Sequence, residues 1–162
     1  MKLLFVRHAK ATDRLKALLS EVADADRPLT KKGKQKFREF TAKNATLFQD
    51  VEVFATSPYL RARQTLDVIL ENLTPAKRRK VKIETLNFIT PDDDAEKFLL
   101  WLKKQSVKTL LVVGHEPFIS NLLAIRVKNP PEKIKKGSIL VLEVENAAFQ
   151  LKSIKNIKDD AE

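Results

Sequence analysis

The sequence contains no cysteine and only three glycines, Gly33, Gly114 and Gly137. Without cysteine, the chain has no disulfide scaffold, no zinc–thiolate site and no cysteine nucleophile. Glycines spaced so widely cannot form the glycine-rich loops that hold nucleotide phosphates. The two histidines, His8 and His115, are too few for a histidine-dominated metal centre.

Long apolar runs are also missing. The longest have about five residues, whereas a membrane helix needs roughly 20. The chain begins with an apolar run at residues 3–6, but Arg7, His8 and Lys10 interrupt it before a secretory signal can form. We therefore expect a soluble, cytoplasmic protein that does not contact a membrane.

The 162 residues, 43% of them apolar, suit a single domain over residues 1–162 that ends in a charged tail from about Lys155. The 31 Lys and Arg against 21 Asp and Glu give a net charge of +10, which points to an anionic substrate or partner. The basic residues 77–80 are interpreted as a solvated loop. No aromatic side chains are interleaved with them for base stacking, so no nucleic-acid partner is expected.

Strand-like and helix-like segments alternate along the chain. Strands are expected near residues 3–6, 51–55, 81–86 and 110–113, with a terminal hairpin from residues 139–144 and 149–154. A helix is expected from Thr30, and another from Ser57 as N-cap, with Pro58 at its first position, to about Asn72. This order predicts an α/β fold, a three-layer α/β/α sandwich with a mostly parallel central sheet.

Chemically active side chains follow three of these strands. Arg7 and His8 follow the first strand, Ser57 and Arg61 the second, and His115 a later one. Ligands of such folds bind beyond the carboxyl ends of the strands. Two imidazoles and two guanidinium groups at one edge predict a pocket for a phosphoryl group.

Four segments carry a resemblance to a known family. They are Arg7-His8-Ala9, Asp26-Arg27-Pro28-Leu29 followed by Gly33, Ser57-Pro58-Tyr59-Leu60-Arg61-Ala62-Arg63-Gln64-Thr65, and Gly114-His115-Glu116-Pro117. In this order they resemble the motifs of the histidine phosphatase superfamily, which has the phosphoglycerate mutase-like fold. The resemblance is strongest to its small SixA-type phosphohistidine phosphatases, and it extends from residue 3 to about residue 120.

The resemblance implies a role for each of these side chains. His8 would be the nucleophile and would carry the phosphoryl group as a phosphohistidine intermediate. Arg7, Arg61 and a cationic His115 would surround the phosphoryl oxygens, and Ser57 with the helix behind it would add donors. No metal ion or organic cofactor is expected.

The proton donor for the leaving group is the open role. In one branch of the family a carboxylic acid directly follows the second histidine, and Glu116 occupies that position here. Glu116 is equally well interpreted as a solvated loop residue, and Glu84 is a second candidate without a clear motif. A phosphohistidine substrate makes the question less pressing, because its leaving imidazole has a pKa near 6.5 and can carry its own proton.

The resemblance also narrows the substrate. Arg14 stands near the place where mutases often have an asparagine, and the chain lacks the large insertions that enclose small substrates in mutases and phytases. An open site suits a phosphorylated protein, and hence a role in signal transduction. The alternatives are a small-molecule phosphomonoesterase of the same superfamily and, in another class, a non-catalytic basic module that binds anionic partners.

Overall fold

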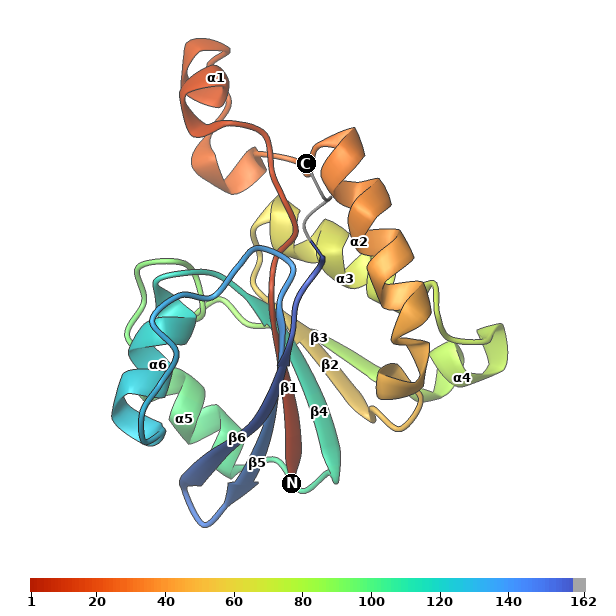
Figure 1. The fold of residues 1–162 in the computed structure, drawn as a ribbon, viewed down its shortest axis with the longest axis vertical. Helices are drawn as coiled ribbons and strands as arrows, with labels where there is room; N and C mark the ends of the chain where they lie inside the picture. The colour runs from red at the N-terminus through yellow and green to blue at the C-terminus, as the bar shows by residue number, and fades with distance from the viewer. Residues whose placement is uncertain (159–162) are drawn as a thin grey trace.

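The computed structural model describes residues 1–158, which are built around a six-stranded sheet in the order β3-β2-β4-β1-β5-β6 (Figure 1). The strands are β1 (Lys2–Arg7), β2 (Val53–Thr56), β3 (Lys82–Thr85), β4 (Thr109–Gly114), β5 (Ile139–Glu145) and β6 (Ala148–Lys155). Neighbouring strands from β3 to β1 are parallel, whereas β5 pairs antiparallel with both β1 and β6. The predicted α/β class and mostly parallel sheet are confirmed.

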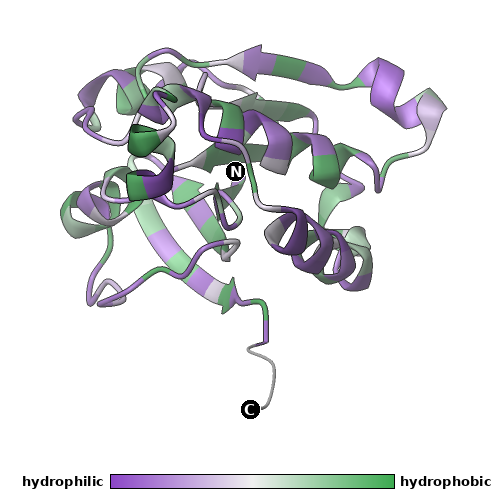
Figure 2. Ribbon diagram, turned by 90° about the horizontal axis from the view of Figure 1, so that it is seen from above, coloured by the Kyte–Doolittle hydropathy of each residue, from purple (hydrophilic) through white to green (hydrophobic). Residues whose placement is uncertain are grey.

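Helices cover both faces of the sheet because the central strands are apolar on both faces. In β1, Leu3 and Phe5 face α5 (Glu96–Lys103) and α6 (Phe118–Arg126). Leu4 and Val6, between them in sequence, face α2 (Lys31–Lys43) and α3 (Leu60–Leu70). Figure 2 shows hydrophobic residues both in the strands and on the helices beside them, with hydrophilic residues interspersed. This three-layer core fixes the strand ends from which the candidate site is built.

The remaining helical segments are short. They are α1 (Arg14–Leu19), α4 (Pro75–Lys80) and two 3-10 turns, η1 (Asp24–Asp26) and η2 (Ala45–Phe48). α1 and η1 lie on an excursion of the chain between β1 and α2, which projects beyond the body of the molecule (Figure 1). No helix within residues 1–158 is long and apolar enough to cross a membrane.

Two local predictions are wrong. Ser57 does not cap a helix: α3 starts at Leu60, because the Ser57 backbone N–H still donates to Val113 of β4 and its hydroxyl contacts His115. Residues 77–80 belong to the helix α4, since the side chain of Thr74 caps it. At the start of the predicted tail, Asn156 Oδ1 accepts a hydrogen bond from Ser138 Oγ at 2.5 Å. Residues 159–162 of the predicted tail lie outside the described residues.

Candidate active site

The candidate site lies where the parallel strands end, at their carboxyl edge. The backbone N–H of His8 donates to Gly114 O at 3.0 Å, and that of Ser57 to Val113 O at 3.1 Å. The segment before β5 closes the other side, where Gly137 N–H donates to the carbonyls of both Arg7 and His8 at 3.0 Å. These backbone bonds bring together the ends of three strands, as the sequence predicts, with the segment before β5 as a fourth component.

His8 is held with one ring nitrogen free. Its side chain is buried, and its Nδ1 lies 2.7 Å from the carbonyl oxygen of Ala9. A carbonyl oxygen only accepts hydrogen bonds, so Nδ1 carries the proton and Nε2 keeps its lone pair. Burial lowers the pKa of His8 to about 3, and the nearby charges of Arg61 and Arg7 act in the same direction. His8 is therefore neutral at pH 7, which is the form that can act as a nucleophile.

His115 lies beside His8 and is fully buried, with the two ring centroids 5.1 Å apart. Its Nε2 lies 2.7 Å from the hydroxyl of Ser57, which also accepts a hydrogen bond from the backbone N–H of Tyr59. The proton of that hydroxyl is thus available for Nε2, and this leaves the ring proton of His115 on Nδ1. Burial, followed by the neighbouring His8, lowers the pKa of His115 to about 2.

Arg7 and Arg61 supply positive charge on either side of the histidines. Arg7 Nη1 donates to Ile134 O at 2.6 Å, and Arg61 Nη1 donates to Asp24 O at 2.6 Å. Within residues 1–158, the Nε atoms of both arginines and the Nδ1 of His115 are buried without a hydrogen-bond partner. Buried polar nitrogens are rarely left unsatisfied, so three of them in one site indicate a place for an anionic ligand with several acceptor oxygens.

Asp24, Arg27 and Tyr59 also belong to this site, although the sequence analysis assigned them no role in it. Asp24 Oδ2 accepts from Arg61 Nη2 at 3.2 Å, and Asp24 Oδ1 accepts from Arg27 Nε at 2.8 Å. Partial burial acts to raise the pKa of Asp24, but the hydrogen bond from Arg27 and the charge of Arg61 hold it below its usual value. The guanidinium of Arg61 lies 4.9 Å from the centre of the Tyr59 ring. For Arg27 and Tyr59 the sequence did hold a signal, because both lie within the four segments that resemble the family.

Other motif residues fasten the site together. Thr65 Oγ1 accepts from the backbone N–H of Ala9 at 3.0 Å and donates to Arg61 O at 2.7 Å, so it ties the end of β1 to α3. Gln64 Oε1 accepts from the backbone N–H of Leu29 at 2.8 Å. Ala9 is buried and does not have the positive φ that would require glycine.

The two candidate proton donors have other partners. Glu116 accepts from the backbone N–H of Ser120 at 2.8 Å with one oxygen and from the Ser120 hydroxyl with the other, across the start of α6. Burial lowers the pKa of Arg7, and the charge of Glu116 acts against this shift, so Glu116 lies at the border of the site. Glu84 lies on the edge strand β3 and pairs with Lys82 at 3.4 Å.

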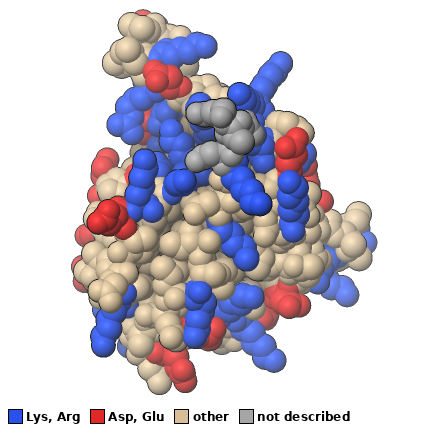
Figure 3. Space-filling model, in the orientation of Figure 1, with Lys and Arg blue, Asp and Glu red and all other residues tan. Residues whose placement is uncertain are grey.

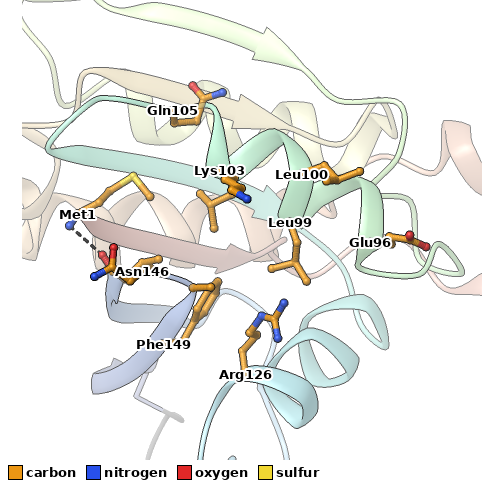
Figure 4. A pocket seen from close by; sticks show the side chains of 12 residues that line it. Met1, Glu96, Leu99, Leu100, Lys103, Gln105, Arg126, Asn146 and Phe149 are labelled. Atoms are coloured by element: carbon orange, nitrogen blue, oxygen red, sulfur yellow. Dashed lines mark hydrogen bonds between the residues drawn. The ribbon is translucent and has the colours of Figure 1, made fainter.

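A hollow of about 720 Å³ lies elsewhere, between α5, α6 and the β5–β6 turn (Figure 4). Met1 lines it, so it lies toward the start of β1, whereas Arg7 and His8 follow the end of that strand. No group of three or more His, Cys, Asp or Glu within residues 1–158 could hold a metal ion. The chemistry of the candidate site rests on its histidines and arginines.

The fold and this site define a class, the phosphoglycerate mutase-like α/β proteins with a histidine pair at the carboxyl edge of the sheet. The chain belongs to the histidine phosphatase superfamily (branch 1), whose sequence model matches residues 3–86. An uncharacterized protein of Picosynechococcus sp. is 32% identical over 156 residues, which cover 93% of this chain and 89% of that relative.

Solved structures of phosphatases have the same fold. The protein histidine phosphatase SixA complexed with tungstate has a TM-score of 0.76 at 23% identity, over 95% of this chain and 96% of that one. A SixA from Agrobacterium tumefaciens, described as a putative phosphohistidine phosphatase, has 0.78 at 18% identity, over 96% and 97%. The alpha-ribazole phosphatase of Shigella flexneri has 0.70 at 17% identity, over the whole of both chains. The phosphoglycerate mutase-like fold is confirmed, and the chain is a phosphatase of this superfamily.

Proposed function

We propose that this phosphatase hydrolyses phosphohistidine on a protein, with His8 as the nucleophile. The observation that carries this proposal is the state of the acidic groups: both oxygens of Glu116 are engaged by Ser120, while His8 has a free Nε2. An alkoxide leaving group needs a proton donor, but an imidazole leaving group does not. The likeness to two structures described as SixA supports the same substrate class.

In the first step, the lone pair of His8 Nε2 attacks phosphorus and forms a new P–N bond. The P–N bond of the substrate breaks, and its electron pair returns to the substrate imidazole, which leaves neutral because its other nitrogen carries a proton. Arg7, Arg61 and His115 donate to the phosphoryl oxygens as their charge redistributes. The carbonyl of Ala9 accepts the hydrogen bond of the His8 Nδ1–H and stabilises the positive charge that the ring gains.

In the second step, water attacks the phosphorus on His8. The P–N bond breaks, its electron pair returns to Nε2, and the water proton passes to solvent or phosphate. The products are inorganic phosphate and the neutral His8 with its proton on Nδ1, as at the start. Neither step uses a carboxylic acid as proton donor.

The rival substrate class is a small phosphomonoester, as the similarity to an alpha-ribazole phosphatase indicates. The two classes differ in their leaving groups, so kcat/KM is compared for a histidine-phosphorylated protein, a phosphoserine peptide and alpha-ribazole phosphate. We expect the phosphohistidine protein to exceed the others by about tenfold or more. A higher kcat/KM on either phosphomonoester contradicts the substrate assignment.

The intermediate is tested separately, with ³²P-labelled substrate and an alkaline quench that preserves phosphohistidine. The wild-type enzyme should retain label on its own chain, separate from the label on the substrate. His8→Ala should retain no label on its chain and should show no turnover. Lys152→Ala, an exposed change on β6, is the matched control and should keep the wild-type rate. Label retained by His8→Ala removes His8 from the nucleophile role, provided that circular dichroism shows both variants folded.

A further inference from the structure

The short helix α1 turns its apolar side chains outward. Leu15, Leu18 and Leu19 are 62%, 71% and 77% exposed, and Val22 after the helix is also exposed. We call these four residues the leucine face. Only Ala17 of α1 is buried. A surface helix normally directs such a stripe toward the core, and a grouped apolar patch on a surface marks an interaction site.

The leucine face is fastened to the candidate active site. The excursion that carries it is closed at its base, where Ala11 forms a β-bridge with Leu29 and the backbone N–H of Thr12 donates to Pro28 O at 2.9 Å. Beyond α1, Asp24 pairs with Arg61, the arginine beside the two histidines. The excursion that carries the leucine face is therefore anchored at both ends beside residues of the candidate site.

Lysines surround the base of this excursion. Lys10, Lys32, Lys36 and Lys136, which we call the lysine rim, line a small hollow of about 140 Å³ together with Gly33 and Ile157. Burial lowers the pKa of Lys136, and so do the charges of Arg7, Lys10 and Arg27, which shows how much positive charge gathers here. Figure 3 shows the protrusion of α1 with charged side chains of both signs on it, and Lys and Arg side chains crowded beneath it.

We propose that the leucine face and the lysine rim together dock the protein substrate: a folded phosphoprotein with an apolar patch flanked by carboxylates. This inference rests on the proposed function, since the docked protein presents its phosphohistidine to His8. Charge complementarity selects this occupant. A second copy of this chain would bring two lysine rims together, and like charges oppose such a contact. Nucleic acid does not fit this surface, because base stacking requires aromatic rings and the leucine face has none.

The test separates docking from chemistry with two substrates. Leu15→Ser/Leu18→Ser/Leu19→Ser should lower kcat/KM on a small acidic protein, phosphorylated on a surface histidine with phosphoramidate, by about tenfold or more through KM. On p-nitrophenyl phosphate, which is too small to reach α1, the same variant should stay within about twofold of wild type. Leu100→Ser/Ile125→Ser is the matched control, since both side chains are 58% exposed but lie on α5 and α6. This variant should keep the wild-type kcat/KM on both substrates.

Charge is tested in the same assay. Lys32→Glu should lower kcat/KM on the acidic phosphoprotein but not on a basic protein phosphorylated in the same way. Lys152→Glu should leave kcat/KM unchanged on both proteins. An equal loss on both substrates, or no loss, in the leucine variant overturns the docking surface. The docking surface is also overturned if wild type sediments as a dimer and the leucine variant as a monomer. The same holds if wild type floats with anionic vesicles and the leucine variant does not. If wild type hydrolyses p-nitrophenyl phosphate but no phosphohistidine protein, the proposed function is wrong, and the docking inference falls with it.

Discussion

The two histidines of the site are held in different ways, and this difference assigns their roles. His8 donates from Nδ1 to a backbone carbonyl, so its Nε2 lone pair is exposed to an electrophile. His115 meets a hydroxyl at Nε2, so its Nδ1 is free to donate. From the sequence we expected a cationic His115. Burial and the neighbouring His8 lower its pKa to about 2, so the cationic form requires a bound dianion that raises this pKa. The neutral ring can already donate a hydrogen bond from Nδ1.

Ser57 is the residue that tests this assignment. It is fully buried, and its hydroxyl lies 2.7 Å from Nε2 of His115, where it can fix the tautomer of that ring. Ser57→Ala should lower kcat by about 10²-fold, the effect of losing one aligned oxyanion donor, with a smaller effect on KM. Lowering the pH should not rescue the variant, because His8, with its pKa of about 3, is protonated before His115, with its pKa of about 2.

Thr41→Val is the control for Ser57→Ala. It removes another buried hydroxyl, one that donates to Arg38 O within α2, and should leave kcat and its pH profile unchanged. An unchanged kcat in Ser57→Ala would mean that the Ser57 hydroxyl does not orient His115.

Glu116 tests how the leaving group is protonated. Both of its oxygens accept hydrogen bonds from Ser120 in the first turn of α6, so Glu116→Gln should barely change kcat/KM on a phosphohistidine protein or on p-nitrophenyl phosphate. A general acid would instead lose roughly 10²–10⁴-fold on alkyl phosphates alone. Rates on all three substrates decide between these outcomes. A loss confined to alkyl phosphates would favour the phosphomonoesterase alternative.

At the scale of elements, periodicity predicted the layers but not how the segments between them lie. Residues 3–6 and 110–113 are apolar on both faces, which only a strand at the centre of a sheet requires, and they became β1 and β4. The excursion between β1 and α2 has no apolar stripe that faces the core, so nothing local revealed that Asp24 pairs with Arg61. The contact of Arg7 with Ile134 spans 127 residues and depends on the closed sheet.

The contact between α2 and the end of β1 also depends on the fold, and Gly33 makes it possible. A Cβ on Gly33 would lie 2.6 Å from the carbonyl oxygen of Lys10 and 2.8 Å from the Thr30 hydroxyl that caps α2. Gly33→Ala should therefore lower the free energy of unfolding by about 1–2 kcal/mol, because overpacking outweighs the gain in helix propensity. Since the clash displaces the chain two residues after His8, kcat/KM should fall as well.

Urea unfolding and assays on the same samples measure both effects. Gln35→Ala, an exposed change in the same helix, is the control and should stay within about 0.5 kcal/mol of wild type. A Gly33→Ala variant as stable and as active as wild type would show that the chain at Lys10 yields without disturbing His8.

At the scale of the whole molecule, the strands brought together residues that the sequence marked separately. His8, Ser57 and His115 are far apart in the chain, yet each follows a parallel strand, so the sheet alone predicted their proximity. The predicted roles of these residues, and of Arg7, Arg61 and Glu116, stay predictions until the variants are assayed. The contact of Ser57 with His115 could not be predicted, because it joins residues 58 positions apart and depends on packing around the site rather than on local sequence.

Placing two neutral imidazoles in the interior also makes the stability of the molecule depend on pH. The pKa values of about 3 for His8 and about 2 for His115 lie below the ordinary 6.5 that each regains on unfolding. Between pH 6.5 and about 3, the unfolded chain binds protons that the folded chain does not. The free energy of unfolding should thus fall with decreasing pH by up to about 1.4 kcal/mol per pH unit for each histidine.

Urea unfolding at pH 7, 6 and 5 measures this slope. The two histidines begin to act below pH 6.5, whereas the depressed pKa of Asp24 acts only at lower pH, so this window belongs to the imidazoles. Acidification also adds to the net charge of +10, but wild type and His8→Asn share that self-repulsion. His8→Asn should therefore lose about half of the slope, in proportion to the one imidazole removed. Equal slopes in the two proteins would mean that His8 binds its proton in the folded state, and such a histidine could not be the nucleophile at neutral pH.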